Sequence, residues 1–412
     1  MDFFKDLRKL ERVGLIFFCF FVALQCISNA AANIALGVAT FFLLLDVFFQ
    51  SSQNNFERLK SLWRENKKIF FSFLIFWCAI LLSALFSGEM QKGLKIFLGQ
   101  FVYRTAPLFI ILFFFRQARY AKFFLLLCIA SCALDVLGSL LLQGFGPRLQ
   151  GFFGSPMTLA GFLVVIIPVL FCCIMTWEQN KTGLLVAAFF SLVLFMGLLL
   201  NATRGAWLAL AITLPFTAIL YDRSSKKMLF LIALIAATST IFLSTPHLQK
   251  RVESITSSTF QSNTERLLMW KSAYNMFKDN PIIGVGIGQY APKYLKEYRS
   301  PESKEIQNHC HNNFLQMLAE NGILGLLAFS ILFGYLLYSS LITFWSQNNP
   351  FALLAFGVTL ALLLQGMTEY NFGNSAVIKF YWTVLGCLLI LTRSGQKLSY
   401  LFTIQKTGNG YE

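Results

Sequence analysis

Residues 183–200 read GLLVAAFFSLVLFMGLLL and contain no charged side chain. An α-helix of this length is about 27 Å long, close to the thickness of a bilayer core, which needs about 20 mostly apolar residues. The whole chain is 56% hydrophobic and 13% charged, whereas a soluble globular protein is about 25% charged. The composition therefore excludes a soluble enzyme, a disordered protein and a nucleic-acid-binding domain, and it predicts a membrane protein.

Similar apolar stretches recur along the 412 residues, without an internal repeat. They predict an all-α polytopic membrane protein with about twelve transmembrane helices. In this division 1–245 holds nine helices, 246–319 a large hydrophilic helical loop, 320–392 three helices and 393–412 a tail. The expected spans are 13–28, 30–50, 68–87, 96–115, 121–142, 157–176, 183–200, 205–221, 228–245, 320–344, 350–368 and 376–392.

The positive charge of the chain is unevenly distributed between the two sides of the expected bundle. The formal net charge is +15, and with a cytoplasmic N-terminus nineteen of the 34 basic residues fall in cytoplasmic segments. The short outer loops hold only Lys92, Lys95, Arg148 and Arg204. Basic residues near span ends stay in the cytoplasm, so we expect both termini there and the loop 246–319 outside. The basic start runs directly into a hairpin of spans, so no cleavable signal peptide is expected.

The outer loop contains a helical pattern that begins at Ser262 with SNTERLLMWKSAYNMFKDNP. Leu267, Trp270, Tyr274 and Phe277 recur at steps of three and four residues, which is typical of an amphipathic helix. Ser262 and the two polar residues after it can cap the start of this helix. We expect the apolar stripe to pack on the bundle or to lie at the membrane surface.

Three alternating glycines follow in PIIGVGIGQY, residues 281–290. Their spacing is not that of a dinucleotide-binding loop, and they favour a tight turn or a close approach of the backbone to a ligand. The next stretch, NHCHNNFLQMLAENGILGLLAF, predicts a helix capped by Asn308 that continues into the membrane. His311 would share a face of that helix with Leu315 and Leu318.

The chain has three histidines, of which His309 and His311 lie two residues apart in the outer loop. An HxH pair can be half of a metal site, although no third ligand is evident nearby in the sequence. A histidine without chemical function on the surface is a second reading. A general base is the third, because neutral imidazole is available near pH 7.

Arginines on the outer side are the candidate anion ligands. Arg204 lies at the outer end of a span, beside Gly205, which leaves room for a ligand. The planar guanidinium fork fits phosphate oxygens, and a pair of such groups, with Arg266 or Arg148 as further members, would hold a pyrophosphate and stabilise it as a leaving group. Snorkelling of Arg204 to the membrane interface is the alternative.

Four charged residues, Asp46, Arg104, Asp135 and Lys379, fall within expected spans. Charges in lipid are costly and mark candidate functional positions. Solvation is the simpler reading for Asp46 and Lys379, which lie near span ends, and a structural hydrogen bond or ion pair for Asp135. No acidic pair for a divalent cation is visible on the outer side, so neither a metal nor a cofactor is expected.

Four stretches of the chain resemble the O-antigen ligase family, within the ligase and polymerase superfamily of bacterial envelope glycan assembly. They are GFFGSPMTLAG at 151–161, ATRGAW at 202–207, ERLLMWKSAYNMFKDNPIIGVGIGQY at 265–290 and HNNFLQMLAENGILGL at 311–326. The resemblance covers roughly 140–370 in order and spacing. The N-terminal third is similar only in being a series of spans.

The resemblance implies a glycosyltransferase of the GT-C type in the inner membrane of a Gram-negative bacterium, with membrane lipids around it. Such a ligase transfers a glycan from undecaprenyl pyrophosphate to a sugar hydroxyl of lipid A–core at the periplasmic face, in lipopolysaccharide biosynthesis. It implies His311 as general base and Arg204 and Arg266 as pyrophosphate ligands, without metal or cofactor. We infer direct displacement with inversion. As neighbours of these residues, further substrate contacts are expected from Arg148, His309, Asn312 and Gly286.

Three other functions stay open at the level of sequence. A glycan polymerase uses the same donor and adds to another carrier-linked chain. A protein O-oligosaccharyltransferase uses Ser or Thr as acceptor; those relatives often carry additional C-terminal sequence, and only about twenty residues follow the last expected span here. A transporter would show midplane charges and broken-helix repeats, whereas the candidate residues of this chain gather at the outer face.

Overall fold

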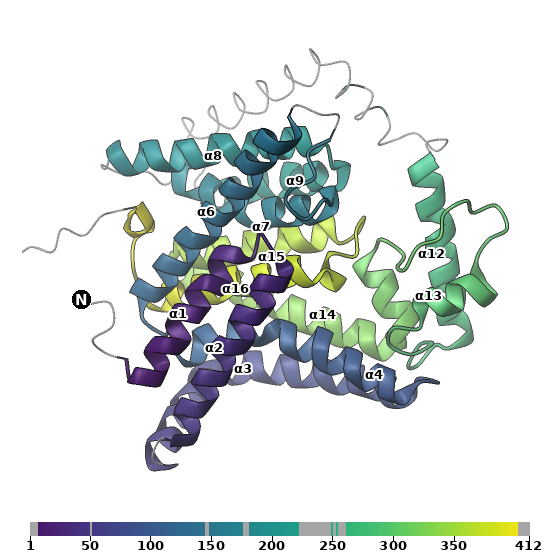
Figure 1. Cartoon of the computed structure of the whole chain (residues 1–412), viewed down its shortest axis with the longest axis horizontal. Coiled ribbons are helices and arrows are strands. Elements are labelled where there is room, and N and C mark those ends of the chain that lie inside the picture. The colour runs from purple at the N-terminus through teal and green to yellow at the C-terminus, as the bar shows by residue number, and fades with distance from the viewer. Residues whose placement is uncertain are drawn as a thin grey trace, which may run out of the picture.

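The computed structural model describes residues 7–49, 52–144, 148–175, 181–221, 249, 253 and 261–402. Within these ranges the chain is helical and contains no strand. The long helices form one bundle, with α12 and α13 at one end and the start of α1 at the opposite end (Figure 1). The helices of the bundle are α1 (Lys9–Leu24), α2 (Asn29–Phe49), α3 (Ser52–Leu85), α4 (Met90–Ile96), α5 (Ala106–Phe113), α6 (Ala118–Gln143), α7 (Pro156–Met175), α8 (Lys181–Asn201), α9 (Arg204–Tyr221), α14 (Asn313–Gln347), α15 (Pro350–Gln365) and α16 (Ser375–Arg393).

The all-α class predicted from the sequence is confirmed for the described residues. Eleven of the expected spans coincide with helices, and the twelfth, 228–245, lies outside the described residues. Eight described helices are long and apolar enough to cross a membrane, and 156–171 and 350–365 form shorter apolar helices. The structure thus fits a multi-pass membrane protein, while the count of about twelve spans stays a prediction.

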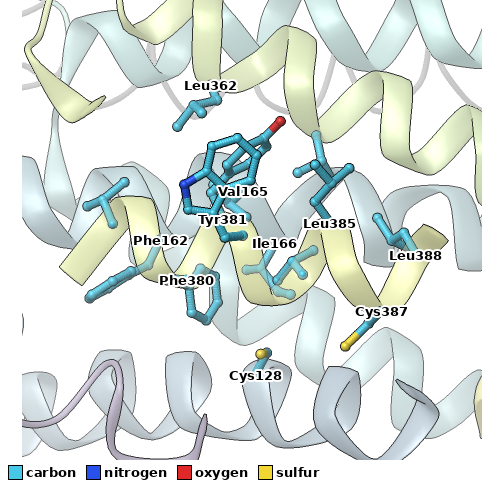
Figure 2. Close-up of a cluster of buried hydrophobic side chains, with 14 of the residues drawn as sticks. Cys128, Phe162, Val165, Ile166, Leu362, Phe380, Tyr381, Leu385, Cys387 and Leu388 are labelled. Atoms are coloured by element: carbon cyan, nitrogen blue, oxygen red, sulfur yellow. The ribbon is translucent and has the colours of Figure 1, made fainter. Parts of the chain in front are cut away.

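The core of the bundle lies around α16, which contacts α5, α6, α7 and α15. Figure 2 shows side chains of α6, α7 and α15 converging on this helix. Phe380 packs edge-on against Phe162 at 5.2 Å between ring centroids, and the hydroxyls of Tyr381 and Thr359 lie 2.9 Å apart. Each buried aromatic side chain contributes roughly 1.5–3 kcal/mol, so this cluster holds α16 against α7 and α15.

Two of the charges within expected spans are buried and have partners, which corrects the solvation reading. Lys379 is 1% exposed and donates from Nζ to the side-chain oxygens of Asn29 and Asn33 on α2. Asp46 is also buried and pairs with Arg8 at the start of α1. Both groups are stabilised by neighbouring helices, as buried ionic groups must be.

Arg104 lies where the helix between α4 and α5 becomes irregular. A π-helical turn, Phe97–Val102, and a 3₁₀ turn, Tyr103–Thr105, separate the two α-helices, and such turns are frequent at functional sites. Arg104 Nη1 donates to the carbonyl of Gly373 at 2.7 Å. It thereby holds the connection between α15 and α16, which carries part of the site described below.

The amphipathic helix predicted in the outer loop is present as α12 (Gln261–Asp279), but its buried face is not the predicted one. Leu267 and Tyr274, members of the predicted stripe, are 55% and 48% exposed. The buried face instead contains Met269, Ala273 and Met276. Packing of the predicted stripe is therefore wrong for Leu267 and Tyr274, whereas Trp270 is partly buried and donates from Nε1 to the carbonyl of Cys310. The alternative, a stripe at the membrane surface, stays a prediction. The residues expected as caps are also inside the helix, because α12 begins one residue before them.

Polar contacts explain why α12 buries the other face. Glu265 is 3% exposed and accepts from the backbone N–H groups of Lys304 and Glu305 and from the hydroxyl of Ser303. Ser272 donates to the carbonyl of Tyr298 at 2.7 Å. These bonds bind α12 to the segment that runs from α13 (Tyr290–Lys293) to α14. A pattern of apolar residues does not contain this information.

The tight turn predicted at the alternating glycines is confirmed. At Gly284 it packs closely against the backbone of α14. All three alternating glycines have positive φ angles, of 71°, 103° and 72°, a region that glycine enters without strain. At Gly284 a Cβ atom would lie 2.4 Å from the backbone carbon of Glu320 on α14. Gly322 breaks α14 with φ of 61°, and the next residue, Ile323, donates to the carbonyl of Pro281. The turn and the first part of α14 therefore form one packed unit.

Candidate active site

A cavity of about 320 Å³ opens at the end of the bundle that carries α12. Its size is in the range of small-molecule sites. Arginines from three separate segments face it, together with two carboxylates and several hydroxyl and amide groups. Its lining consists of Arg148, Met157, Thr203, Arg204, Gly205, Gln261, Ser262, Arg266, Glu305, Gln365, Thr368 and Glu369. The charge distribution favours an anionic ligand, because three guanidinium groups face two carboxylates.

Arg148 lies in the segment between α6 and α7 and is held by the end of α8 and the residues that follow it. Its Nε donates to the carbonyl of Asn201 at 3.1 Å, and its Nη2 donates to the hydroxyl of Thr203 at 2.9 Å. The segment itself is fixed to α6, since buried Asp135 of that helix accepts the backbone N–H of Phe152 at 2.6 Å. The structural hydrogen bond predicted for Asp135 is thus confirmed, and Arg148 is preorganised at the edge of the cavity.

Arg204 is the first residue of α9 and is 8% exposed. Its Nη2 lies 3.4 Å from the hydroxyl of Ser262 on α12. The neighbouring Gly205 packs against the turn after α15, and a Cβ at this position would lie 2.1 Å from Thr368 Oγ1. The glycine beside Arg204 therefore admits a protein segment as well as leaving room for a ligand.

Glu369 joins the histidine and arginine parts of the site. It lies in the connection between α15 and α16 and is 8% exposed. Its Oε2 is 3.0 Å from His311 Nδ1 and 3.9 Å from Arg266 Nη2. Burial raises the pKa of Glu369, but the bond from His311 and the nearby positive charges outweigh it and hold this pKa below its usual value. Glu369 is therefore ionised at neutral pH.

His311 does not lie on a helix, in contrast to the prediction. Its φ is +53°, and α14 begins two residues later with Asn312 as its N-cap. The Asn312 side chain accepts from the backbone N–H of Phe314 and Leu315, so the predicted cap at Asn308 is wrong. A positive φ is uncommon for a residue other than glycine and marks a position held by its surroundings.

His309 provides the contact that holds this conformation. Its Nδ1 accepts the backbone N–H of His311 at 3.2 Å, and the two rings are 4.2 Å apart between centroids. The ring also lies 5.6 Å from that of Tyr370. Burial, with the neighbouring imidazole of His311 and the charge of Arg266, lowers the pKa of His309 to about 4. Its Nδ1 is therefore unprotonated at neutral pH and can accept this hydrogen bond.

The contacts determine which nitrogen of His311 is basic. Ionised Glu369 can only accept a hydrogen bond, so the proton of a neutral His311 is on Nδ1 and the lone pair is on Nε2. An imidazole oriented by a carboxylate in this way is suited to accept a proton from a hydroxyl. His309, His311 and Glu369 also form a group whose candidate ligand atoms lie within 4.8 Å of one another. Glu369 is thus the third candidate ligand that the sequence did not reveal.

The structure brings together some of the residues predicted from the sequence and separates others. Arg148, Arg204 and Arg266 line one cavity, with His311 connected to it through Glu369. Asn312 is outside the lining, where its Nδ2 donates to the carbonyl of Met367. Gly286 is also outside, since the space around it is filled by Ser87. Asn312 and Gly286 thus contact other parts of the protein and not the cavity.

Glu369 is the residue of the site that sequence patterns did not identify. It lies 58 positions from His311, and the expected span 350–368 ended directly before it. In the structure α15 ends at Gln365, and the following turn carries Thr368 and Glu369 back towards α9 and α12. The available signal was a lone acidic residue at the outer end of a span, on the side where the basic candidates lie.

Comparison with known proteins gives a match to a family model and similarity to two relatives. Residues 189–330 match the family model described as O-antigen ligase, so the resemblance predicted from the sequence is confirmed. A Rickettsia conorii protein provisionally named a polysaccharide ligase is 29% identical over 122 residues, and this stretch spans 28% of each chain. An uncharacterised Haemophilus influenzae protein is 25% identical over 290 residues, 64% of this chain and 70% of the relative. Arg148 and Glu369 lie outside the stretch matched by the family model.

Proposed function

We propose that this chain, whose residues 189–330 match the O-antigen ligase family, is a ligase that transfers a glycan from undecaprenyl pyrophosphate to a sugar hydroxyl of lipid A–core. The observation that carries the proposal is the cavity on which Arg148, Arg204 and Arg266 converge from separate segments, with the His311–Glu369 pair at its edge. A coarser statement, a glycosyltransferase of the ligase or polymerase type, is supported by the family match alone.

The cavity is assigned to the pyrophosphate of the donor. Guanidinium groups bind phosphate oxygens through charge-assisted hydrogen bonds, which are roughly twice as strong as neutral ones. Burial lowers the pKa of Arg266, with Glu369 opposing this effect, and the group stays charged at neutral pH. The three guanidinium groups neutralise the charge that develops on the pyrophosphate as its bond to the sugar breaks. No metal ion is required for this stabilisation.

His311 is assigned as the general base for the acceptor hydroxyl. Its Nε2 takes the proton of that hydroxyl while the oxygen forms a bond to the anomeric carbon and the pyrophosphate leaves from the opposite side. The configuration at that carbon is therefore inverted. Glu369 keeps the second proton on Nδ1 and stabilises the imidazolium that forms. General base catalysis of this kind contributes typically 10²- to 10⁴-fold.

The positions of the basic residues support a site on the periplasmic side of the inner membrane. Arg116, between α5 and α6, and Arg393, at the end of α16, both contact Glu65 of α3, so basic residues from two separate segments meet at one carboxylate. The start of α1, with Arg8 and Arg12, lies at the end of the bundle away from α12 (Figure 1). Because positive residues stay in the cytoplasm, the cavity end is assigned to the outside and both termini to the cytoplasm.

Reconstitution in proteoliposomes tests the function. The donor, a glycan on undecaprenyl pyrophosphate, is supplied with either lipid A–core or a second carrier-linked glycan. We expect product on the core only, in buffer treated with a chelator. Longer carrier-linked chains would instead establish a polymerase, and no product with either acceptor would contradict the assignment. A transporter would move the donor across the bilayer without any change in its covalent structure.

The base assignment is tested by His311→Ala. We expect at least a 100-fold loss of transfer. Among the described residues the other imidazole near Glu369 is that of His309, whose Nδ1 accepts a hydrogen bond and whose proton is therefore on Nε2. The control is Lys271→Ala on the exposed face of α12, which should transfer at the wild-type rate. Normal amounts of glycan-capped core from the His311 variant would remove this residue from the mechanism.

A further inference from the structure

His309, His311 and Glu369 have the composition of a zinc site, in addition to their place beside the anion cavity. Two imidazoles and one carboxylate are a ligand set found in zinc proteins, with a water molecule as fourth ligand. One ring nitrogen of each histidine and one carboxylate oxygen lie within 4.8 Å of one another. Ligands of tetrahedral zinc are about 3.3 Å apart, and His311 Nδ1 and Glu369 Oε2 are already separated by 3.0 Å.

The group is accessible and fixed in place. Both imidazoles are partly exposed, so an ion can reach them, while Glu369 is buried and contacts His311 and Arg266. The turn at His311 and the ring contact between the histidines limit the movement that binding needs to rotations of the side chains. A preformed group of ligands loses little conformational entropy on binding, which favours affinity.

We propose that these three residues bind a zinc ion and that the bound ion blocks glycan transfer. Zinc that binds His311 Nδ1 occupies the lone pair of that atom. The imidazole stays neutral, because its single proton is then on Nε2 in place of Nδ1. The nitrogen that would accept the proton of the hydroxyl then carries one itself. The ion also removes Glu369 from Nδ1. The blocking step rests on the general-base role proposed above, whereas zinc binding does not.

Arg266 opposes this site and gives the inference a distinctive test. Its Nη2 lies 3.9 Å from Glu369 Oε2, so a guanidinium charge faces the same carboxylate oxygen that would bind the ion. Repulsion between two cations lowers zinc affinity. Removal of the guanidinium by Arg266→Gln should therefore tighten zinc binding at least threefold, although the same change should impair binding of an anionic substrate.

The experiment is a calorimetric titration of the metal-stripped full-length protein, in detergent micelles, with zinc chloride. We expect one ion per chain in wild type, and at least tenfold weaker binding in His309→Asn and in Glu369→Gln. His309→Asn keeps an oxygen acceptor for the backbone N–H of His311 and so preserves the local fold. The matched control is His247→Ala, which changes the third histidine of the chain and should bind zinc like wild type.

The transfer assay completes the test. Zinc at saturating concentration should abolish wild-type transfer, and a chelator should restore it. Absence of binding, or binding that His309→Asn and Glu369→Gln leave unchanged, would overturn the inference while leaving the metal-free transferase intact. Zinc binding at these residues with full transfer retained would contradict the blocking step and the base role of His311. Failure of transfer in metal-free wild type, with zinc binding intact, would contradict the proposed function alone.

Discussion

Replacement of Glu369 by Gln tests the connection between the histidine and the arginines most directly. The change removes one negative charge and preserves the size of the side chain. In the structure the carboxylate accepts from His311 Nδ1 at 3.0 Å and faces Arg266 at 3.9 Å, and it is 8% exposed. The substitution therefore weakens the contacts of this side chain with both His311 and Arg266.

The magnitude follows from the kinds of bond that are exchanged. A hydrogen bond to a charged group contributes about 1.5–3 kcal/mol and a neutral one about 0.5–1.5 kcal/mol. The difference of about 1–2 kcal/mol corresponds to roughly 5–30-fold in rate. An amide can also turn its NH₂ group towards His311, which favours the tautomer with the proton on Nε2. We therefore expect Glu369→Gln to slow transfer by about 10–100-fold.

The assay is the initial rate of transfer in proteoliposomes at saturating donor and acceptor. Glu297→Gln is the control, because Glu297 pairs only with Lys293 on the surface next to α13 among the described residues. Wild-type transfer by Glu369→Gln would refute the role of the carboxylate. Glu369→Ala should lose more than Glu369→Gln, since it also removes the oxygen beside His311 Nδ1 and puts no polar group in its place.

Three further changes test the remaining contacts. Arg204→Lys should reduce transfer at least tenfold in the same assay, since Lys lacks the planar fork for phosphate; unchanged transfer would exclude bidentate binding. Gly205→Ala should impair transfer because its Cβ would lie 2.1 Å from Thr368 Oγ1, and a second substitution, Thr368→Ala, should recover part of the loss; no recovery would contradict this steric cause. Wild type should lose up to about 3 kcal/mol of stability between pH 6.5 and 4, because the lowered pKa of His309 makes the unfolded chain bind the proton first. His309→Asn should lose less stability between pH 6.5 and 4, as measured by thermal unfolding in micelles, and an equal loss would contradict the neutral state of His309. In the transfer assay His309→Asn should be less impaired than His309→Ala, because it retains an acceptor for the backbone N–H of His311.

Apolar runs of the length of a bilayer were enough to predict most of the bundle. Such runs identify a helix wherever lipid or a helical core surrounds it, because the backbone must then satisfy its own hydrogen bonds. The spans were least accurate at their ends. The run at 350–368 continues beyond the last turn of α15, and the residues after Gln365 leave the helix to pack against Gly205. Hydropathy does not record that contact.

The candidate site was predicted in part, since chemistry of individual residue types is visible in a sequence and pairing across the chain is not. Guanidinium and imidazole groups on the side with few charges indicated anion binding and a base. The partner of His311 was invisible, because a single Glu at a span end has many possible neighbours. The face of α12 was misjudged for a related reason, since Glu265 is buried by bonds to a distant segment.

The order in which the chain is made has a consequence for the site. Arg148, Arg204 and Arg266 are all present in the first two-thirds of the sequence, but Glu369 follows α15, near the end of the bundle. A nascent chain that has released the whole of 189–330 into the membrane already contains the stretch that matches the family and still lacks the carboxylate that orients His311. On the proposed mechanism, full competence for transfer is therefore acquired only when α15 and the turn after it have been inserted.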